Sequence, residues 1–288
     1  MRGTARTTAA ISFVNALFTG VGSAAAVSLS VDATVELTPA RGTARIEFDP
    51  ACDTPLARAA LGAALRRFAP DRDLDVTVAV RSEIPPARGL KSSSAVSAAI
   101  ISATARAAGQ RPPEVDVARI SAEVARTAGI SATGALDDAL AAVGGGAVVT
   151  DTSGGRVLRR DSLPPDWGVV LYVPREHHLP STRWADAFAH RASEGRAAAD
   201  LARAGHYLKA MERNTELVEG IVGLDYRPLR RELERQGALG CGVSGMGPTL
   251  AAVGPSDRLA RLHAALPVGR AERWILSFVA PTGEGERP

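Results

Sequence analysis

The sequence predicts a two-domain protein of mixed helix and strand, of the α+β or α/β class. Segments in which apolar and polar residues alternate, as in strands, are interspersed with segments in which apolar residues recur at helical spacing. Neither kind forms a long run, which argues against an all-helical or all-strand fold. The 288 residues, 45% of them hydrophobic, suffice for two modest cores. Proline and acid gather at 163–166, so we expect domains at 1–160 and 161–288.

The predicted first domain opens on strands. Residues 27–37 and 44–48 alternate on either side of a turn and predict a strand pair, and 74–80 alternates again before two prolines. Apolar residues at helical spacing predict a helix at 55–68. Further elements are predicted as helices at 93–108 and 115–128 and strands at 147–150 and 156–160.

The predicted second domain continues the alternation. Strands are expected at 168–173, 249–253 and 272–280, with helices across 181–224 and at 227–236 and 256–266. The tail at 283–288, rich in glycine and charge, is expected to be disordered.

Composition argues against several classes of partner. The net charge is +3 and no basic run exceeds two arginines, while aromatics make up 4%, so nucleic acid is not expected. No stretch approaches the ~20 apolar residues of a membrane span. His177 and His178 lack a third ligand at metal-binding spacing, which favours an exposed loop pair.

The first 26 residues have an order that also occurs in secretory signals, with arginines before an apolar run. Ser12 and Asn15 interrupt that run, and Gly20 and Gly22 break it before any cleavage site, which favours a folded segment. Cys52 and Cys241 lie far apart without metal spacing and fit a reducing cytoplasm.

Residues 85–95, PPARGLKSSSA, carry the strongest chemical signal, and Lys91 is one of only two lysines among 34 basic residues. A glycine turn precedes three serines at the start of a small-residue helix. The free N–H groups and the dipole of a helix start favour a polyphosphate. The hydroxyls suit Mg²⁺, and the lysine adds a point charge. An ordinary serine cap is the alternative, and the residue order is not that of a Walker A loop.

Two further segments carry candidate chemistry. In TGALDDA, residues 133–139, Asp137 and Asp138 are adjacent in an apolar stretch, where carboxylates are costly unless used or paired. One of them could be the base for an alcohol or a metal ligand, or both could simply favour a helix dipole. Adjacent side chains point in different directions, so the two cannot share one role. Residues 240–249 alternate glycines before a strand, which allows backbone to approach a ligand or merely forms a turn.

Taken in order, these segments resemble the motifs of the GHMP kinase superfamily, which includes galactokinase, homoserine kinase and mevalonate kinase. Residues 85–95 match its P-x-x-x-G-L-[G]-S-S-[A] motif, with Lys91 at the usual Gly and Ser94 at the usual Ala. Residues 244–248 resemble its third motif, and Asp137–Asp138 its Asp-Asn signature. The GLKSSSA and TGAxDDA variants, with the opening residues 3–29, are similar to archaeal-type shikimate kinases.

The resemblance covers nearly the whole chain. It implies an α+β fold in which an N-terminal domain like that of ribosomal protein S5 precedes a ferredoxin-like C-terminal domain, with ATP and substrate between them. It assigns catalysis to Asp137 and Lys91, and Mg²⁺ binding to Ser93 and Glu123. The residues implied for ATP are Pro86, Ala87, Arg88, Gly89, Leu90, Lys91, Ser92, Ser93, Ser94 and Ala95. Those implied for the substrate side are Asp137, Ser244, Gly245 and Gly247, and we expect Asn15 and Thr19 to approach the acceptor as well.

One departure concerns the charge near the catalytic aspartate. Some family members place an N-terminal lysine there, and this N-terminus has none, so Arg6 or Lys91 would have to supply the charge.

The implied activity is ATP-dependent phosphorylation of the 3-hydroxyl of shikimate. The carboxylate of that acceptor leads us to expect an arginine in its pocket. Two alternatives stay open: a kinase for another small alcohol, such as a cyclitol or an aminoshikimate-like intermediate, and a non-catalytic sensor on the same fold. The sequence does not specify the oligomeric state.

Overall fold

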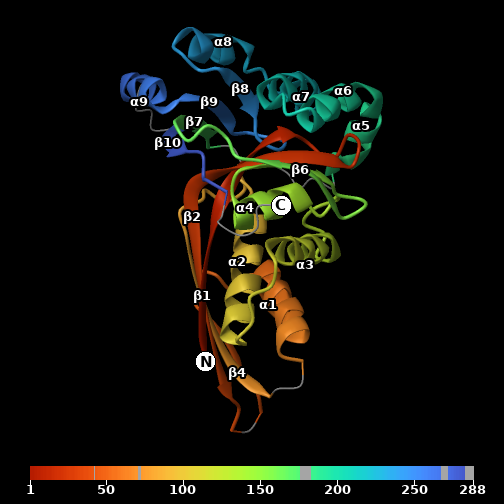
Figure 1. Cartoon of the computed structure of the whole chain (residues 1–288), viewed down its shortest axis with the longest axis vertical. Coiled ribbons are helices and arrows are strands. Elements are labelled where there is room, and N and C mark those ends of the chain that lie inside the picture. Colours follow the sequence, from red (N-terminus) through yellow and green to blue (C-terminus); the bar gives the residue numbers. More distant parts are fainter. Residues whose placement is uncertain (42, 71–72, 176–182, 267–271, 283–288) are drawn as a thin grey trace.

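The computed structural model of the chain describes residues 1–41, 43–70, 73–175, 183–266 and 272–282. The predictions for His177, His178 and the tail at 283–288 lie outside the described residues. Two sheets follow one another along the long axis of the molecule, the first built by the N-terminal half and the second by the C-terminal half (Figure 1). No helix in these ranges is long and apolar enough to cross a bilayer.

A long antiparallel hairpin organises the first sheet. β1 (Arg2–Val14) pairs with β2 (Val21–Pro39), and β2 also pairs with β4 (Leu74–Ser82) and β5 (Ala147–Asp151). β3 (Ile46–Phe48) and β6 (Arg156–Asp161) complete the order β3-β4-β2-β5-β6. The first half of β1 alternates between exposed and buried residues, whereas nearly all of its second half is buried. Both α2 and α7 pack against β1, and Phe13 stacks on Tyr207 of α7 with ring centroids 5.1 Å apart.

The helices of the first half are α1 (Pro55–Phe68), α2 (Ser92–Ala107), α3 (Glu114–Thr127) and α4 (Leu136–Gly144). α1 begins after Thr54, whose hydroxyl accepts a hydrogen bond from the Ala57 N–H at 3.1 Å. α2 is buried over most of its length, because its alanines and serines let neighbouring elements approach closely. The packing of this central helix in the first half of the chain fixes the position of its N-terminus, at Ser92.

The second sheet is antiparallel in the order β10-β7-β9-β8, with β7 (Trp167–Pro174), β8 (Gly240–Val243), β9 (Leu250–Pro255) and β10 (Glu272–Phe278). Its helices are α5 (Ala185–Ala189), α6 (Ala192–Arg203), α7 (Tyr207–Val222), α8 (Arg227–Arg235) and α9 (Ser256–Ala265). After β10 the chain returns to the first sheet, where the Ala280 N–H donates to the Ala26 carbonyl at 3.0 Å. The division at 160/161 stays a prediction, and β6 ends one residue beyond it, at Asp161.

Three elements differ from the sequence-based expectation. Residues 2–14 form a strand, although apolar residues dominate their second half, because that half is covered on both sides. β3 pairs in parallel with β4 instead of forming a hairpin with β2, whose partners are β1, β4 and β5. Residues 240–243 form β8, so the glycine-rich loop is limited to 244–249.

Candidate functional site

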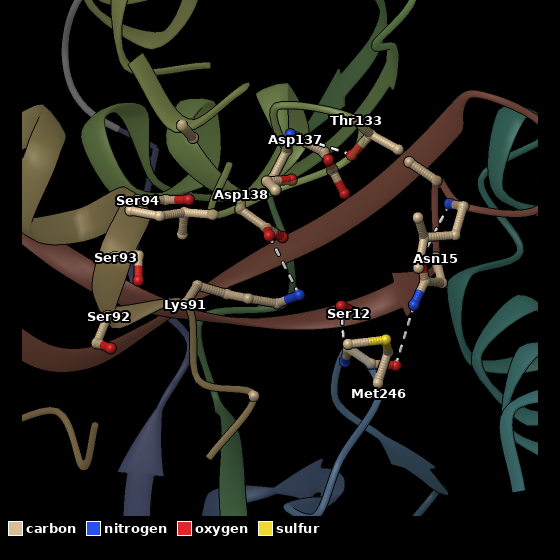
Figure 2. Close-up of a pocket in the computed structure, with 18 of the residues that line it drawn as sticks. Ser12, Asn15, Lys91, Ser92, Ser93, Ser94, Thr133, Asp137, Asp138 and Met246 are labelled. Atoms are coloured by element: carbon tan, nitrogen blue, oxygen red, sulfur yellow. Dashed lines mark hydrogen bonds and ion pairs between the residues drawn. The ribbon is translucent and has the colours of Figure 1, made fainter. Parts of the chain in front are cut away.

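A cavity of about 400 Å³ lies where the two halves of the chain meet. It is lined by the end of β1, the loop before α2, the connection from α3 to α4, and the loop after β8. Figure 2 shows Ser92, Ser93 and Ser94 on one side of it and Asn15 and Met246 on the other.

The serine side of the cavity is the start of α2, as predicted. Ala87, Gly89 and Lys91 all have positive φ, at 54°, 78° and 64°, so the loop turns sharply before the helix begins. Among the described residues, no side chain caps the N-terminus of α2. All three serines line the cavity. Free helix N–H groups and hydroxyls thus face the space where a polyphosphate would lie.

The ten residues predicted to bind the nucleotide, 86–95, divide into those that line the cavity and those that support the loop from the core. Of the ten residues, Ala87, Arg88, Gly89, Lys91, Ser92, Ser93 and Ser94 line the cavity. Leu90 and Ala95 are buried in the core, and Pro86 does not line the cavity. The Arg88 guanidinium donates to the carbonyls of Pro174 at 2.9 Å and Arg175 at 2.7 Å, which ties the loop to the end of β7.

The glycine-rich loop, residues 244–249, contacts the loop at residues 86–94 directly, and we call the latter the serine loop. The Ser244 hydroxyl donates to the Gly89 carbonyl at 2.7 Å, and the Ser12 hydroxyl accepts from the Gly245 N–H at 3.1 Å. A Cβ on Gly89 would lie 2.3 Å from the Ser244 carbonyl oxygen. Ser244 is buried behind the cavity, unlike Gly245 and Gly247, which line it. Ser244, predicted to bind substrate, therefore serves to join the two loops.

The predicted aspartate pair lies in the first turn of α4, with Lys91 opposite. Lys91 Nζ is 3.2 Å from Asp138 Oδ2, and Asp137 and Asp138 are 4% and 7% exposed (Figure 2). Burial, followed by the charge of Asp138, raises the pKa of Asp137 to about 8, while Lys91 acts in the opposite direction. Burial also raises the pKa of Asp138, and Lys91 again opposes it. Two buried carboxyls share one cation, which favours a proton on Asp137 near neutral pH.

Gly22 of β2 makes room for the Asp137 carboxyl. A Cβ at this position would lie 2.5 Å from both Cγ and Oδ2 of Asp137. The strand and α4 thus approach closely enough to fix the carboxyl against the cavity wall.

The side of the cavity opposite the serines is formed by Ser12, Asn15, Thr133 and Met246, among others. The Asn15 side-chain amide donates to the Gly245 carbonyl at 3.3 Å and accepts from the Leu17 N–H at 3.0 Å. Asn15 therefore lines this side as predicted. Thr19 does not line the cavity, because its hydroxyl accepts from the Val21 N–H at 3.3 Å within the β1–β2 turn.

Two predicted residues lie away from the cavity. Glu123 is exposed on α3, because the buried face of that helix is formed by neighbours such as Ala122 and Val124. Arg6 pairs with Asp32 at 2.8 Å on the surface, so Lys91 is the cation near Asp137. Among the described lining residues, Arg88 is the one arginine, and it lies on the serine side, so the expected acceptor arginine is not seen there.

Sequence reasoning assigned no role to Gly22, Thr133 or Met246. The segment quoted around Asp137 contained Thr133, but nothing in the pattern marked it as a lining residue. Gly22 could have been noted as a glycine inside an alternating strand, which often marks close approach of another group.

Two family models match the chain. Residues 56–146 match the GHMP kinases N terminal domain, and residues 194–267 match the GHMP kinases C terminal model. Among solved structures, the chain is similar to the mevalonate kinase of Methanococcus jannaschii, with a TM-score of 0.76, 12% identity and coverage of 97% and 99% of the two chains. It is also similar to the galactokinase of Lactococcus lactis, with a TM-score of 0.71, 11% identity and coverage of 98% and 94%. These two likenesses concern the fold.

Sequence relatives are more similar. A shikimate kinase of Methanothrix thermoacetophila is 38% identical over 88% of this chain and 85% of its own length. Shikimate kinases of Methanosarcina mazei and Halobacterium salinarum are each 34% identical, over 88% and 89% of this chain and 85% and 90% of their own lengths. With both domain models matched in order and the serine loop facing the aspartate pair across one cavity, the chain belongs to the GHMP kinase family.

Proposed function

We propose that this protein transfers the γ-phosphoryl group of ATP to the 3-hydroxyl of shikimate. The proposal draws on relatives at 34–38% identity over most of the chain that are named shikimate kinases. The observation that carries it is the buried pair Asp137 and Asp138, which faces Lys91 and the serines at the start of α2 across the cavity. We place the reaction in the cytoplasm, where the two free cysteines, both buried, stay reduced.

The chain is a small-molecule kinase, and its own groups divide the work of the transfer. The start of α2 holds the phosphates with its N–H groups and with the hydroxyls of Ser92 and Ser93. The acceptor hydroxyl attacks the γ-phosphorus, its oxygen forms the new P–O bond, and the bond to the ADP oxygen breaks. Asp137 in its ionised form accepts the hydroxyl proton, and Lys91 offsets negative charge on the transferring group.

Members of this family use ATP with Mg²⁺, and the oxygen donors around the cavity suit that ion. In the described part of the chain no three His, Cys, Asp or Glu side chains form a metal cluster. The Ser93 hydroxyl, which lines the cavity, would hold the ion beside the nucleotide phosphates. When bound, Mg²⁺ neutralises phosphate charge.

The substrate assignment is tested by ADP release with shikimate, quinate, homoserine, mevalonate and a cyclitol as acceptors. We expect turnover with shikimate that requires Mg²⁺ and ATP, and a product whose phosphorus couples to the proton on carbon 3 in NMR spectra. Turnover of the cyclitol without turnover of shikimate would replace the substrate and keep the kinase. A lack of turnover with every acceptor, despite ATP binding, would favour the sensor alternative.

Gly22→Ala tests whether the position of Asp137 matters for transfer. The new methyl must displace the Asp137 carboxyl, because its Cβ would lie 2.5 Å from two of that side chain's atoms. We expect kcat to fall about 100-fold, the loss associated with a displacement of ~1 Å. Gly62→Ala on α1 is the control, since its nearest atom, Arg66 Nη1, is 3.5 Å away. Equal activity of the two variants would show that the carboxyl tolerates displacement.

A further inference from the structure

The Lys91 ammonium lies at the junction of three elements. Its side chain leaves the serine loop, and Nζ reaches Asp138 Oδ2 on α4 at 3.2 Å. Nζ also lies 3.1 Å from the place where a Cβ on Gly245 would be, so the glycine-rich loop leaves room for it. Figure 2 shows this side chain extending from the serine side towards the centre of the site, below Asp138.

Holding a lysine in this place requires an anchor. Lysine has a long flexible side chain, and confining it costs rotamer entropy. The Lys91 side chain is only 12% exposed, and its backbone has a φ of 64°, a left-handed conformation uncommon outside glycine. The ion pair with Asp138 is the contact that anchors the ammonium in this place.

Asp138 is poorly suited to a purely structural role. Its other oxygen, Oδ1, is buried and has no hydrogen-bond partner among the described residues. A buried carboxylate oxygen left unpaired costs stability, and an ion pair in such a place seldom repays the loss of hydration. Asp138 differs in this from Asp32, whose two oxygens both accept from Arg6 on the surface.

We propose that Asp138 is a positioning residue that holds the Lys91 ammonium between the serine loop and the acceptor side, where charge develops during transfer. This inference rests on the proposed function and divides the work of the adjacent aspartates. Asp137 takes the proton, while Asp138 acts through Lys91 and needs no contact with the substrate. The cation is then in place before the phosphoryl group moves, so no reorganisation is needed during the reaction.

A double-mutant cycle tests this coupling. Asp138→Asn, Lys91→Met and the double variant are compared with wild type for kcat and for KM of ATP and acceptor. We expect Asp138→Asn alone to lower kcat about 100-fold, with each KM changed less than about threefold. In the Lys91→Met background the same change should lower kcat less than about threefold, because Asp138 no longer has a cation to hold. Asp32→Asn is the matched control for removing one paired carboxylate, and should keep full activity.

Two outcomes would overturn the proposal. One is an equal loss from Asp138→Asn in the presence and absence of Lys91, which would give Asp138 an independent role. The other is a loss confined to KM. Melting temperatures of all variants separate these results from unfolding, and the double variant restores the charge balance. Turnover of shikimate by wild type tests the proposed function separately, and the cycle can use any other acceptor that wild type phosphorylates.

Discussion

Asp137→Asn should remove phosphoryl transfer and at the same time stabilise the folded chain. An amide cannot accept the hydroxyl proton, and loss of a general base typically costs between about 100-fold and 10,000-fold in kcat. Nucleotide binding should persist, because the start of α2 is unchanged. The measurements are ADP release and titration with an ATP analogue. More than about a tenth of wild-type activity in the variant would remove Asp137 from the role of base.

The stabilising effect has a defined pH dependence. Burial raises the pKa of Asp137 from its ordinary 3.8 to about 8, so between these values the folded chain binds a proton that the unfolded chain releases. The free energy of unfolding of wild type therefore falls as pH rises through this window. The Asp137→Asn variant does not lose stability in this way, because an amide does not titrate. The melting temperature of Asp137→Asn should exceed that of wild type by more at pH 9 than at pH 5.

Asp32→Asn again provides the control, because the pKa of Asp32 is shifted in the opposite direction to that of Asp137. The Arg6 guanidinium lowers the pKa of Asp32, so its contribution to stability is present above its ordinary pKa and disappears as pH falls. A difference between Asp137→Asn and wild type that does not vary with pH would contradict the buried proton.

Gly89→Ala should damage both the nucleotide site and the fold. A Cβ here would lie 2.3 Å from the Ser244 carbonyl oxygen and 2.9 Å from that of Gly247, and backbone atoms cannot turn aside as side chains do. The φ of 78° adds about 1–2 kcal/mol of strain. We expect kcat/KM for ATP to fall at least about 100-fold, because the two loops must separate. Steady-state kinetics and thermal melts measure both effects.

Gly109→Ala is the control that introduces the strain of a positive φ without a steric clash. Gly109 follows the other end of α2 with a φ of 81°, and no atom of the described residues lies within 4 Å of a Cβ built there. This variant should lose some stability and keep its turnover. If Gly89→Ala behaved in the same way, the contact between the two loops would not matter for catalysis.

The parts of the site that the sequence predicted are those encoded in contiguous residues. The serine loop is predictable because its glycine, lysine and serines follow one another in the sequence, and the adjacent aspartates are conspicuous in an apolar stretch. Glu123 lies away from the cavity, because one residue of helical rotation separates the buried face of α3 from solvent. Ser12 and Gly22 owe their roles to contacts across more than 100 residues, with Gly245 and Asp137, which no local pattern shows.

The same distinction holds for the fold. Helix α1 agrees with its expected bounds, because its apolar spacing and its ends are local signals. The residues of β1 have two patterns in one strand, since its first half faces solvent on one side and its second half is covered on both. The partner of β3 depends on which strands already flank β2, and that is a property of the whole sheet.

The hydrogen bonds from Ser244 to Gly89 and from Gly245 to Ser12 have a consequence for exchanging parts between relatives. If the loop before α2 binds the nucleotide as proposed, the first 160 residues alone do not set nucleotide affinity, because the Ser244 hydroxyl and the Thr249 N–H of the second half bond to carbonyls of that loop. A chimera that takes its second half from a distant relative would have different residues in contact with that loop. Altering acceptor preference by recombination would then alter ATP affinity as well, unless residues 244–249 and the loop that they contact are taken from the same parent.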